Sequence, residues 1–287
     1  MRVALLCSRI RVEEKLLRHA LQRRGVTVEV VDDRELVLDL AGPRRDWDVV
    51  LQRSLSQTRG LAAARVLAAA GVAVVNQPEV TALCADKLAT TALLHAAGVP
   101  VPRTLVAFSA ESALRAAEEL GYPVVLKPVS GSWGRMLARL NDRDAAEAVF
   151  EDRTVLGSPE HSVFYVQEHV AKPGRDIRAF VVGDEVICAV FRESAHWITN
   201  TARGATTRDC VVTSDIARLC VQSARAVGGG VLAVDLLEDG DRLLVSEVNA
   251  TMEFRNSIDV TGVDIPGRVA GVVIDAARGA QTMAAAG

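Results

Sequence analysis

Three side chains with oxygen donors in the C-terminal third of the chain have the spacing of a metal site. Asp235 follows the apolar run VLAV, and Glu247 and Asn249 follow a second run, LLVS. The turn sequence EDGD lies between the runs and predicts a hairpin with Asp235 and Glu247 on adjacent strands. Glu247 and Asn249 are two residues apart and would share one face. A set of three oxygen ligands suits one or two Mg²⁺ ions, because Mg²⁺ also binds phosphates and water. The alternative is a buried network in which Asp235 pairs with an arginine or Asn249 makes hydrogen bonds.

A lysine at the end of an apolar segment precedes a loop of small residues. Lys127 ends the segment YPVVLK, and the loop that follows contains Ser130, Gly131, Ser132, Trp133 and Gly134. The backbone N–H groups of such a loop can bind phosphate oxygens, and the lysine adds a point charge. Taken alone, the pattern fits an incidental hairpin turn equally well. Neither GxxxxGK[ST] nor GxGxxG occurs, so a P-loop or Rossmann site is not indicated.

A second candidate nucleotide segment ends a strand and enters a loop. It contains Gln167, Glu168, His169 and Val170, and its backbone groups could read the edge of an adenine. Glu168 or Asp176 could hold a ribose hydroxyl, and Arg178 shares the face of Asp176. The alternative is an exposed turn with a surface ion pair of little energetic value.

The segment FRESAHWITNTARGAT at 191–206 is long for a hairpin loop, and loops of this length are often functional. Arg192 and Arg203 suit a carboxylate or a phosphate, and Asn200 lies between them. His196 could act as a general base, although a lone histidine more often makes hydrogen bonds or packs. A disordered loop is the alternative.

Lysine is rare in this chain. Only four of the 33 basic residues are lysines, namely Lys15, Lys87, Lys127 and Lys172. A lysine retained among so many arginines indicates a position where the compact ammonium group of lysine cannot be replaced by the planar guanidinium group of arginine.

Length and composition exclude several classes of protein. The 287 residues can form one large domain or two to three small ones, and the net charge of −3 gives no bias toward nucleic acid or membrane. No apolar stretch reaches 18 residues, and the N-terminus looks like a first strand. Five scattered cysteines without a CxxC motif predict reduced thiols in a cytoplasmic protein without a zinc site.

The segments that must position these residues alternate between strand and helix patterns. Residues 1–84 predict a parallel α/β sheet. Residues 85–98 predict one helix with Asp86 in its first turn. Hairpins are expected over 176–194 and 230–249, and a closing helix over 263–278 precedes a frayed tail.

Seven stretches together resemble the ATP-grasp superfamily. Within it they are similar to the RimK-like carboxylate–amine ligases, and most similar to the LysX branch. The stretches span nearly the whole chain: SQTRGLAAAR at 56–65, VVNQPEVTALCADK at 74–87, YPVVLKPVSGSWGR at 122–135, QEHVAKPGRDIRAFVVG at 167–183, SAHWITNTARGA at 194–205, AVGGGVLAVDL at 226–236 and EVNATMEFRNSIDVTGVDIPG at 247–267.

The resemblance implies an α/β (α+β) ATP-grasp fold in which two β-rich lobes clamp ATP. The expected domains are 1–84, a pre-ATP-grasp domain, 85–168, a central lobe, and 169–287, a C-terminal lobe with the magnesium and substrate sites. Lys87 and Lys127 match the lysines that touch the nucleotide, and Lys172 lies beside these motifs. The resemblance also assigns the adenine to the segment around Glu168, and two Mg²⁺ ions to the three residues of the predicted metal site.

The implied reaction joins the amino group of α-aminoadipate to the side-chain carboxyl of a C-terminal Glu on a small acidic carrier protein, LysW. Asn256-Ser257 matches the pair that marks aminoadipate enzymes, where glutamate enzymes carry Gly-Phe. Catalytic roles fall to Arg178, Arg192, Asn200 and Arg203. Substrate contacts are expected from Arg192, His196, Asn200, Thr201, Ala202, Arg203, Gly204, Glu253, Asn256 and Ser257. A homodimer or homotetramer is expected from the family.

Three other functions stay open at this point. One is a RimK-like ligase that adds glutamate to another protein or small molecule. Another is the same carrier chemistry serving a specialised metabolite. The third is an ATP-binding regulator without turnover, which the intact metal-binding residues argue against.

Overall fold

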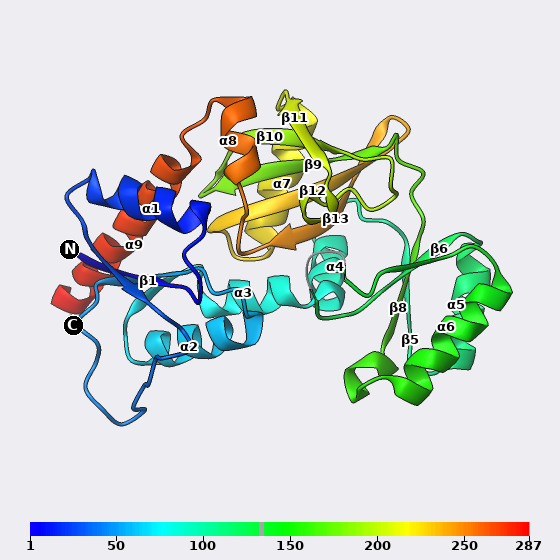
Figure 1. The fold of residues 1–287 in the computed structure, drawn as a ribbon, viewed down its shortest axis with the longest axis horizontal. Helices are drawn as coiled ribbons and strands as arrows, with labels where there is room; N and C mark the ends of the chain where they lie inside the picture. Colours follow the sequence, from blue (N-terminus) through cyan, green and yellow to red (C-terminus); the bar gives the residue numbers. More distant parts are fainter. Residues whose placement is uncertain (132–134, 287) are drawn as a thin grey trace.

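The computed structural model describes residues 1–131 and 135–286, and within them the strands form three sheets (Figure 1). One sheet is parallel and two are antiparallel. The predicted α/β class is therefore confirmed. No helix in the described ranges is both long and apolar enough to cross a bilayer.

The first sheet is parallel, with the strand order β2-β1-β3-β4. Its elements in chain order are β1 (Arg2–Leu6), α1 (Val12–Gln22), β2 (Thr27–Val31), β3 (Val49–Gln52), α2 (Gln57–Ala69), β4 (Ala73–Val75) and α3 (Pro78–Ala85). Alternate residues of β1 enter two cores: Val3 and Leu5 pack with α1, whereas Ala4 and Leu6 pack with α2. Burial on both faces is what a parallel strand covered by helices requires.

The second sheet is antiparallel, with the order β5-β8-β6-β7, and lies at the far end of the molecule from the N-terminus (Figure 1). It contains β5 (Thr104–Ala107), α5 (Ala110–Leu120), β6 (Val124–Lys127), β7 (Ala138–Leu140), α6 (Arg143–Leu156), a 3₁₀ turn (Pro159–Ser162) and β8 (Phe164–Glu168). Helices α5 and α6 cover one face through a core that includes Phe150 and Phe164. The other face is left to line a site.

The third sheet lies between the other two (Figure 1), with the order β11-β10-β9-β12-β13. Its elements are β9 (Arg175–Val182), β10 (Glu185–Glu193), a 3₁₀ turn (Thr201–Arg203), β11 (Thr206–Cys210), α7 (Ser214–Ala226), β12 (Val231–Asp239), β13 (Arg242–Asn249) and α8 (Arg255–Thr261). The last helix, α9 (Ile265–Ala286), returns to pack on α1 and the first sheet. Both predicted hairpins are present.

The helix boundaries differ from the sequence prediction in three places. The helix expected over 85–98 is α4 (Lys87–Ala96), which begins after Asp86, and a separate helix, α3, ends just before it at Ala85. Asp86 caps α4, because its carboxylate accepts a hydrogen bond from the backbone N–H of Ala89 at 2.9 Å. Helix α8 was missed because it is short. The tail expected to fray continues α9 to Ala286.

Candidate active site

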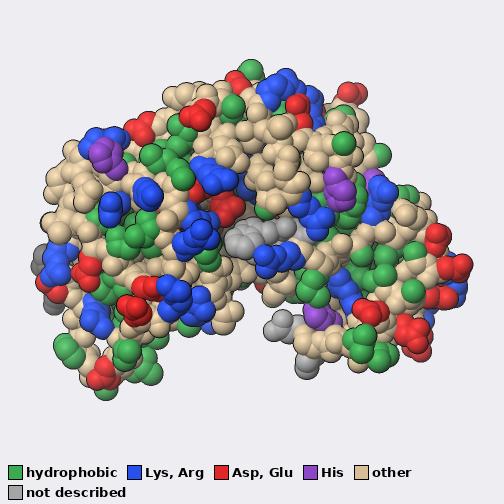
Figure 2. Space-filling view, in the orientation of Figure 1, with side chains coloured by type: hydrophobic (Ala, Val, Ile, Leu, Met, Phe, Trp, Pro, Cys, Tyr) green, Lys and Arg blue, Asp and Glu red, His purple; other side chains and the backbone are tan. Residues whose placement is uncertain are grey.

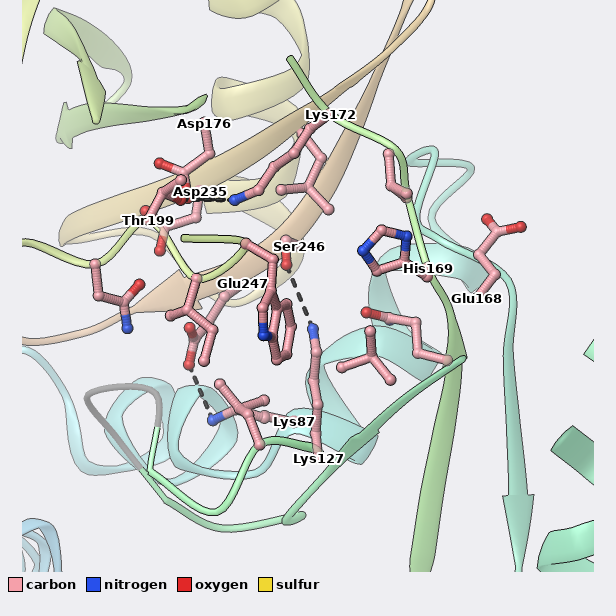
Figure 3. Close-up of a pocket in the computed structure, with 18 of the residues that line it drawn as sticks. Lys87, Lys127, Glu168, His169, Lys172, Asp176, Thr199, Asp235, Ser246 and Glu247 are labelled. Atoms are coloured by element: carbon pink, nitrogen blue, oxygen red, sulfur yellow. Dashed lines mark hydrogen bonds and ion pairs between the residues drawn. The ribbon is translucent and has the colours of Figure 1, made fainter. Parts of the chain in front are cut away.

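A cavity of about 120 Å³ lies where the second and third sheets meet, and three of the four lysines line it (Figure 3). We call it the lysine cavity. The predicted site residues among its walls are Lys87, Lys127, Gly131, Gln167, Glu168, His169, Val170, Lys172, Asp176, Arg192, Asn200, Asp235 and Glu247. The structure thus brings together residues separated by up to 160 positions in the sequence (247 − 87).

Strand alternation places Lys127 in this cavity. Val124 and Leu126 of β6 enter the core of the second sheet, so Val125 and Lys127 face the opposite way. Burial lowers the pKa of Lys127 to about 8, and the positive charges of Lys87 and Lys172 add to the effect while Glu247 opposes it. An anion entering the cavity would relieve this accumulation of positive charge.

Lys87 opens helix α4 directly after its cap. Its Nζ lies 3.0 Å from Oε1 of Glu247 and donates a hydrogen bond of 2.6 Å to the carbonyl of Gly131. Lys87 therefore connects the carboxylate on β13 with the start of the small-residue loop. Ser130 pairs with Asp86 in an isolated β-bridge on the same side.

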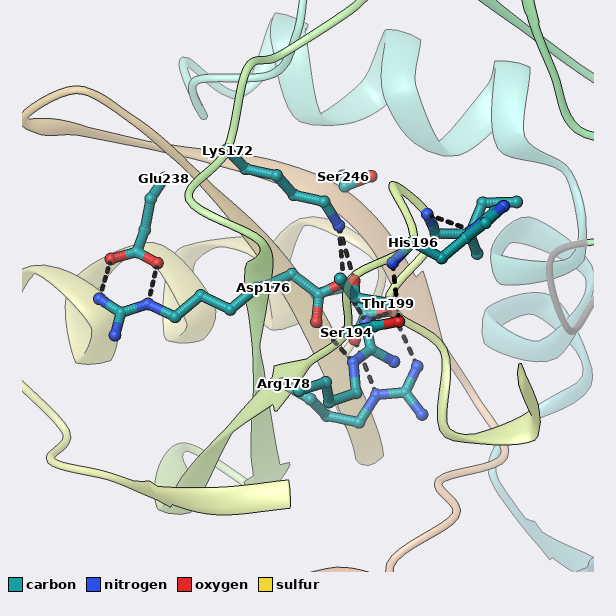
Figure 4. A network of polar contacts seen from close by, with 12 residues as sticks. Lys172, Asp176, Arg178, Ser194, His196, Thr199, Glu238 and Ser246 are labelled. Carbon is teal, nitrogen blue, oxygen red and sulfur yellow. Dashed lines mark hydrogen bonds and ion pairs between the residues drawn. The ribbon is translucent and has the colours of Figure 1, made fainter. Parts of the chain in front are cut away.

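A row of alternating charges leads away from the lysine cavity (Figure 4). Lys172 donates to Oγ1 of Thr199 at 2.6 Å, and its Nζ lies 3.5 Å from Oδ2 of Asp176. Asp176 also receives two hydrogen bonds from Arg192, at 2.6 and 2.8 Å, and one from the Thr199 hydroxyl. The Asp176 carboxylate is buried, and these hydrogen bonds to it hold Arg192 in place. The predicted contact of Asp176 with a ribose hydroxyl stays a prediction.

The row continues through Asp235. Arg192 approaches Oδ2 of Asp235 at 3.2 Å, and Arg178 binds both carboxylate oxygens at 2.7 Å. Burial alone would raise the pKa of Asp235, but Arg178 and Arg192 lower it to about 2. Asp235 is therefore ionised at neutral pH and holds two arginines at the border of the cavity.

A β-bulge shapes this part of the hairpin. Asp235 pairs with Glu247, but the next residue, Leu236, pairs with Val245, so Ser246 is an extra residue. Because of the bulge, Ser246 and Glu247 both line the lysine cavity. Ser246 accepts a hydrogen bond from Lys127 at 3.5 Å.

The donor set of the hairpin fits Mg²⁺. Asp235 and Glu247 are cross-strand neighbours, and Asn249 follows Glu247 by two residues. The buried side-chain nitrogen of Asn249 has no hydrogen-bond partner among the described residues, so the amide can turn its oxygen outward without breaking a bond. Two carboxylates and one amide leave room for phosphate and water ligands, which Mg²⁺ usually retains. The described residues contain no group of three His, Cys, Asp or Glu side chains that could hold a metal.

The predicted adenine segment also lines the lysine cavity. Gln167 is buried and donates to the hydroxyls of Thr104 and Tyr165, both at 2.9 Å. Glu168 accepts a 2.7 Å hydrogen bond from the backbone of Arg103, and it lies at the edge of the group in Figure 3. Burial lowers the pKa of His169, so its imidazole is favoured in the neutral form.

Two further cavities adjoin the first at Arg192, which lines all three. The middle cavity, about 110 Å³, is lined by the predicted residues Arg178, Asn200, Thr201, Ala202, Glu247, Asn249 and Glu253. The arginine cavity, about 520 Å³, is lined by Arg178, Thr201, Ala202, Glu253, Asn256 and Ser257. In the space-filling view, Lys and Arg side chains gather around the hollow at the centre of this face (Figure 2).

Several predicted residues lie elsewhere. His196, Arg203 and Gly204 line none of these three cavities, and Nδ1 of His196 accepts a local hydrogen bond of 3.0 Å from Ile198 N–H. Ser132, Trp133 and Gly134 lie outside the described residues. Their predicted roles stay predictions.

The first sheet also contributes to the site, which the sequence patterns did not predict. Arg9, Arg11, Glu13 and Lys15 all line the arginine cavity. A signal was present in the motif RIRVEEK, a charged run directly after the first parallel strand, because ligands bind at the carboxyl ends of strands in α/β sheets.

Comparison with known proteins agrees with this geometry. Residues 3–83 match the LysX preATP-grasp domain, and residues 84–273 match the RimK-like ATP-grasp domain. The α-aminoadipate–LysW ligase LysX of Saccharolobus solfataricus is 34% identical over 260 residues, covering 89% of this chain and 94% of that protein.

Two other relatives are similar over nearly the whole chain. The glutamate–LysW ligase ArgX of Sulfurisphaera tokodaii is 32% identical over 268 residues, covering 92% of this chain and 95% of that protein. The crystal structure of a RimK domain ATP-grasp protein from Sphaerobacter thermophilus is 32% identical with a TM-score of 0.79, covering 96% of this chain and 100% of that one. The chain therefore belongs to the RimK-like ATP-grasp family and is an ATP-dependent carboxylate–amine ligase.

Proposed function

We propose that the enzyme joins the α-amino group of α-aminoadipate to the side-chain carboxyl of a C-terminal Glu on a small acidic, LysW-like carrier protein. The observation that carries the proposal is the junction of two cavities at Arg192. One is lined by lysines suited to nucleotide phosphates, and the other is large and cationic. The similarity to the LysW ligases LysX and ArgX supports a carrier protein as the substrate that supplies the carboxyl group.

In the first step, the carrier carboxylate attacks the γ-phosphorus of ATP. A bond forms between the carboxylate oxygen and phosphorus, the bond to the bridging oxygen breaks, and ADP leaves with its electron pair. Lys87, Lys127 and Lys172 would neutralise the phosphate oxygens and align them, which are the main sources of catalysis in phosphoryl transfer. Asp235, Glu247 and Asn249 would hold Mg²⁺, which when bound neutralises further phosphate charge.

In the second step, the amine nitrogen attacks the acylphosphate carbonyl. The new C–N bond forms, inorganic phosphate leaves, and the amine loses a proton. Arg178 and Arg192 would stabilise the developing negative charge, since Arg192 lines all three cavities and Arg178 lines the middle and arginine cavities.

The choice of α-aminoadipate rests on Asn256 and Ser257, both on the wall of the arginine cavity. Glutamate is the second candidate, because the glutamate–LysW ligase ArgX is almost equally similar. The same carrier chemistry could also serve a specialised metabolite. We retain the proposed domains 1–84, 85–168 and 169–287, with ATP held between the last two.

Intact-mass spectrometry tests the proposal. A LysW-like carrier ending in Glu is incubated with the enzyme, ATP, Mg²⁺ and single amino acids. A mass gain equal to α-aminoadipate minus water is expected. A gain with glutamate alone would replace the substrate, and no gain with any amino acid would overturn the carrier reaction.

A further inference from the structure

Two buried polar side chains of the first sheet contact the segment that follows Asn249, the last of the three proposed metal ligands. Asn76 comes directly after β4 and is 6% exposed, and Arg53 comes directly after β3 and is 4% exposed. Both strands are parallel to β1, so the two residues lie at the carboxyl edge of the first sheet. Neither residue lines the lysine, middle or arginine cavity, so any effect of theirs on the reaction must be indirect.

The Asn76 amide joins both strands of the β12–β13 hairpin. Its Nδ2 donates to the carbonyl oxygens of Val231, at 2.8 Å, and Ala250, at 2.7 Å, while its Oδ1 accepts from the N–H of Val231 at 2.7 Å. Val231 is the first residue of β12, and Ala250 follows Asn249, the last residue of β13. The last backbone pair of the hairpin is Ala233 with Asn249, so the amide holds the two strands together just beyond this pair.

The backbone beside this amide leaves no room for a side chain. Gly230 has a φ of +113°, a conformation that favours glycine, and a Cβ atom there would overlap Oδ1 of Asn76. The glycine therefore allows the chain to approach the amide closely enough for the hydrogen bonds to Val231 to form.

Arg53 holds the next part of the same segment. Its Nη1 donates to the carbonyl oxygen of Met252 at 2.8 Å, and its Nε donates to Oε1 of Glu14 at 3.1 Å. Glu14 is fully buried and also binds Arg11 at 2.8 Å, so it neutralises the buried guanidinium and fixes its direction. Arg53 and Asn76 line one small internal cavity together with Met252, so the two contacts lie side by side.

The orientation of Asn249 depends on these contacts. β13 is an edge strand of the third sheet and, among the described residues, pairs with β12 alone. The side-chain nitrogen of Asn249 is buried but has no hydrogen-bond partner in the same ranges. The direction of the Asn249 amide is therefore set by its backbone, which Asn76 and Arg53 fix through residues 250–252.

We propose that Asn76 and Arg53 are positioning residues that hold Asn249 in the orientation that binds Mg²⁺. The first domain would thereby control the affinity for the metal at a site to which it supplies none of the three proposed ligands. Partners that orient a metal ligand in this way usually change metal affinity when they are removed. The inference rests on the proposed metal role of Asn249, and on neither the carrier nor the amine.

The first test measures metal binding without turnover. Mn²⁺, which shares the oxygen ligands of Mg²⁺, is titrated into the enzyme with one equivalent of ADP, and bound Mn²⁺ is followed by electron paramagnetic resonance. Asn76→Ala removes three hydrogen bonds and should weaken Mn²⁺ binding about 10- to 100-fold. The matched control is Ser223→Ala, which removes a fully buried hydroxyl that donates to the carbonyl of Leu219 at 2.7 Å. The control should lose stability but bind Mn²⁺ as the wild type does.

A second variant keeps the test decisive if Asn76→Ala does not fold, which circular dichroism detects. Arg53→Lys retains a positive charge beside Glu14 but replaces two separate donor nitrogens by one, so it should also weaken Mn²⁺ binding, by about 10-fold. Wild-type affinity in folded Asn76→Ala or in Arg53→Lys would overturn the role of that residue, and wild-type affinity in both would overturn the proposal.

A double-mutant cycle tests whether Asn76 acts through Asn249. Asn249→Ala alone should weaken Mn²⁺ binding, and adding Asn76→Ala should weaken it little further, because both changes affect the same ligand. A full additional loss in the Asn249→Ala background would contradict the proposal. If Asn249→Ala bound Mn²⁺ as the wild type does, Asn249 would leave the proposed metal site and the inference would fail with it.

A separate assay distinguishes failure of this inference from failure of the proposed function. Hydroxylamine traps the acylphosphate of the carrier as a hydroxamate without any amino acid. In Asn76→Ala the Mg²⁺ concentration that gives half of the maximal hydroxamate rate should rise, whereas in Ser223→Ala it should not. If the wild type formed no hydroxamate on the carrier, the proposed function would fail, and the Mn²⁺ titration would still decide the inference.

Discussion

The lysine cavity and the arginine cavity adjoin at one residue but hold their positive charge differently. Lys127 is buried with a pKa lowered to about 8, and each ammonium group of the lysine cavity contacts one or two partners at 2.6–3.5 Å, each through a single oxygen. Arg178, at the border of the arginine cavity, instead binds both oxygens of Asp235. A lysine ammonium group can bind phosphate oxygens from several directions, whereas the planar guanidinium group of arginine matches the two oxygens of a carboxylate. Three of the four lysines line the lysine cavity and only Lys15 lines the arginine cavity, which favours phosphate oxygens as the ligand of the lysine cavity.

The two cavities are connected by a row of five alternating charges, Lys172, Asp176, Arg192, Asp235 and Arg178. Each carboxylate in the row has cations on both sides, so the removal of one member exposes its neighbours to an unpaired buried charge. The following predictions test whether the cavities act separately or through this row, beginning with the largest expected effect.

Asp176→Asn should lower the free energy of unfolding by about 3–5 kcal/mol, because it leaves the buried guanidinium of Arg192 without its bidentate partner. Denaturant unfolding measures the change. The matched control is Glu193→Gln, which breaks an exposed pair with Arg208 and should cost less than about 1 kcal/mol. Equal effects of the two variants would show that the row does not stabilise the fold.

Lys127→Ala should slow formation of the trapped hydroxamate about 10²- to 10³-fold, since it removes a preorganised charge at the phosphoryl group. Lys127→Arg should not restore the rate, because the cavity fits a compact ammonium. The affinity for α-aminoadipate, measured by calorimetry, should stay unchanged in both variants. A matching loss of amino-acid affinity would show that the two cavities are coupled.

Asn256→Gly with Ser257→Phe should shift the ratio of kcat/KM for α-aminoadipate over glutamate toward glutamate by about 10- to 200-fold. The physical reason is that both residues line the arginine cavity, where a phenyl group would shorten the space for the longer side chain. Single-substrate kinetics with a fixed carrier measure the ratio. An unchanged ratio with the fold intact would move substrate selection to other residues of that cavity.

The smallest effect concerns stability in acid. Burial would raise the pKa of Glu14, but hydrogen bonding to Arg11 and the charges of Arg53 and Arg11 lower it below its ordinary value of 4.5. The stabilisation is therefore complete above pH 4.5 and is lost as pH falls through the lowered pKa of the folded state. Denaturant unfolding from pH 7 to pH 3 should show a shallower acid decline in Glu14→Gln than in the wild type. Parallel curves would exclude Glu14 from the acid response.

Local patterns predicted much of the fold and part of the site. The parallel first sheet and both hairpins followed from apolar periodicity and turn residues, and the pairing of Asp235 with Glu247 followed from the position of EDGD. The short helix α8 was missed because it spans only seven residues, too few for a helical period to be read with certainty. Asp86 was predicted to lie in the first turn of a helix, whereas it is the N-cap residue of α4. An acidic residue just before a helical pattern is compatible with either position.

The sequence by itself determined which side chains are candidates for the chemistry: the rare lysines and the three oxygen donors stand out by type and by their positions on the predicted strands. Only the tertiary structure decided how they are used. The bulge at Ser246 depends on the register of two strands, and the pairing of Arg178 with Asp235 joins residues 57 positions apart. Glu13 faces a cavity whose other wall lies some 240 residues away (253 − 13). Such contacts are set by packing between distant elements, which local periodicity does not encode.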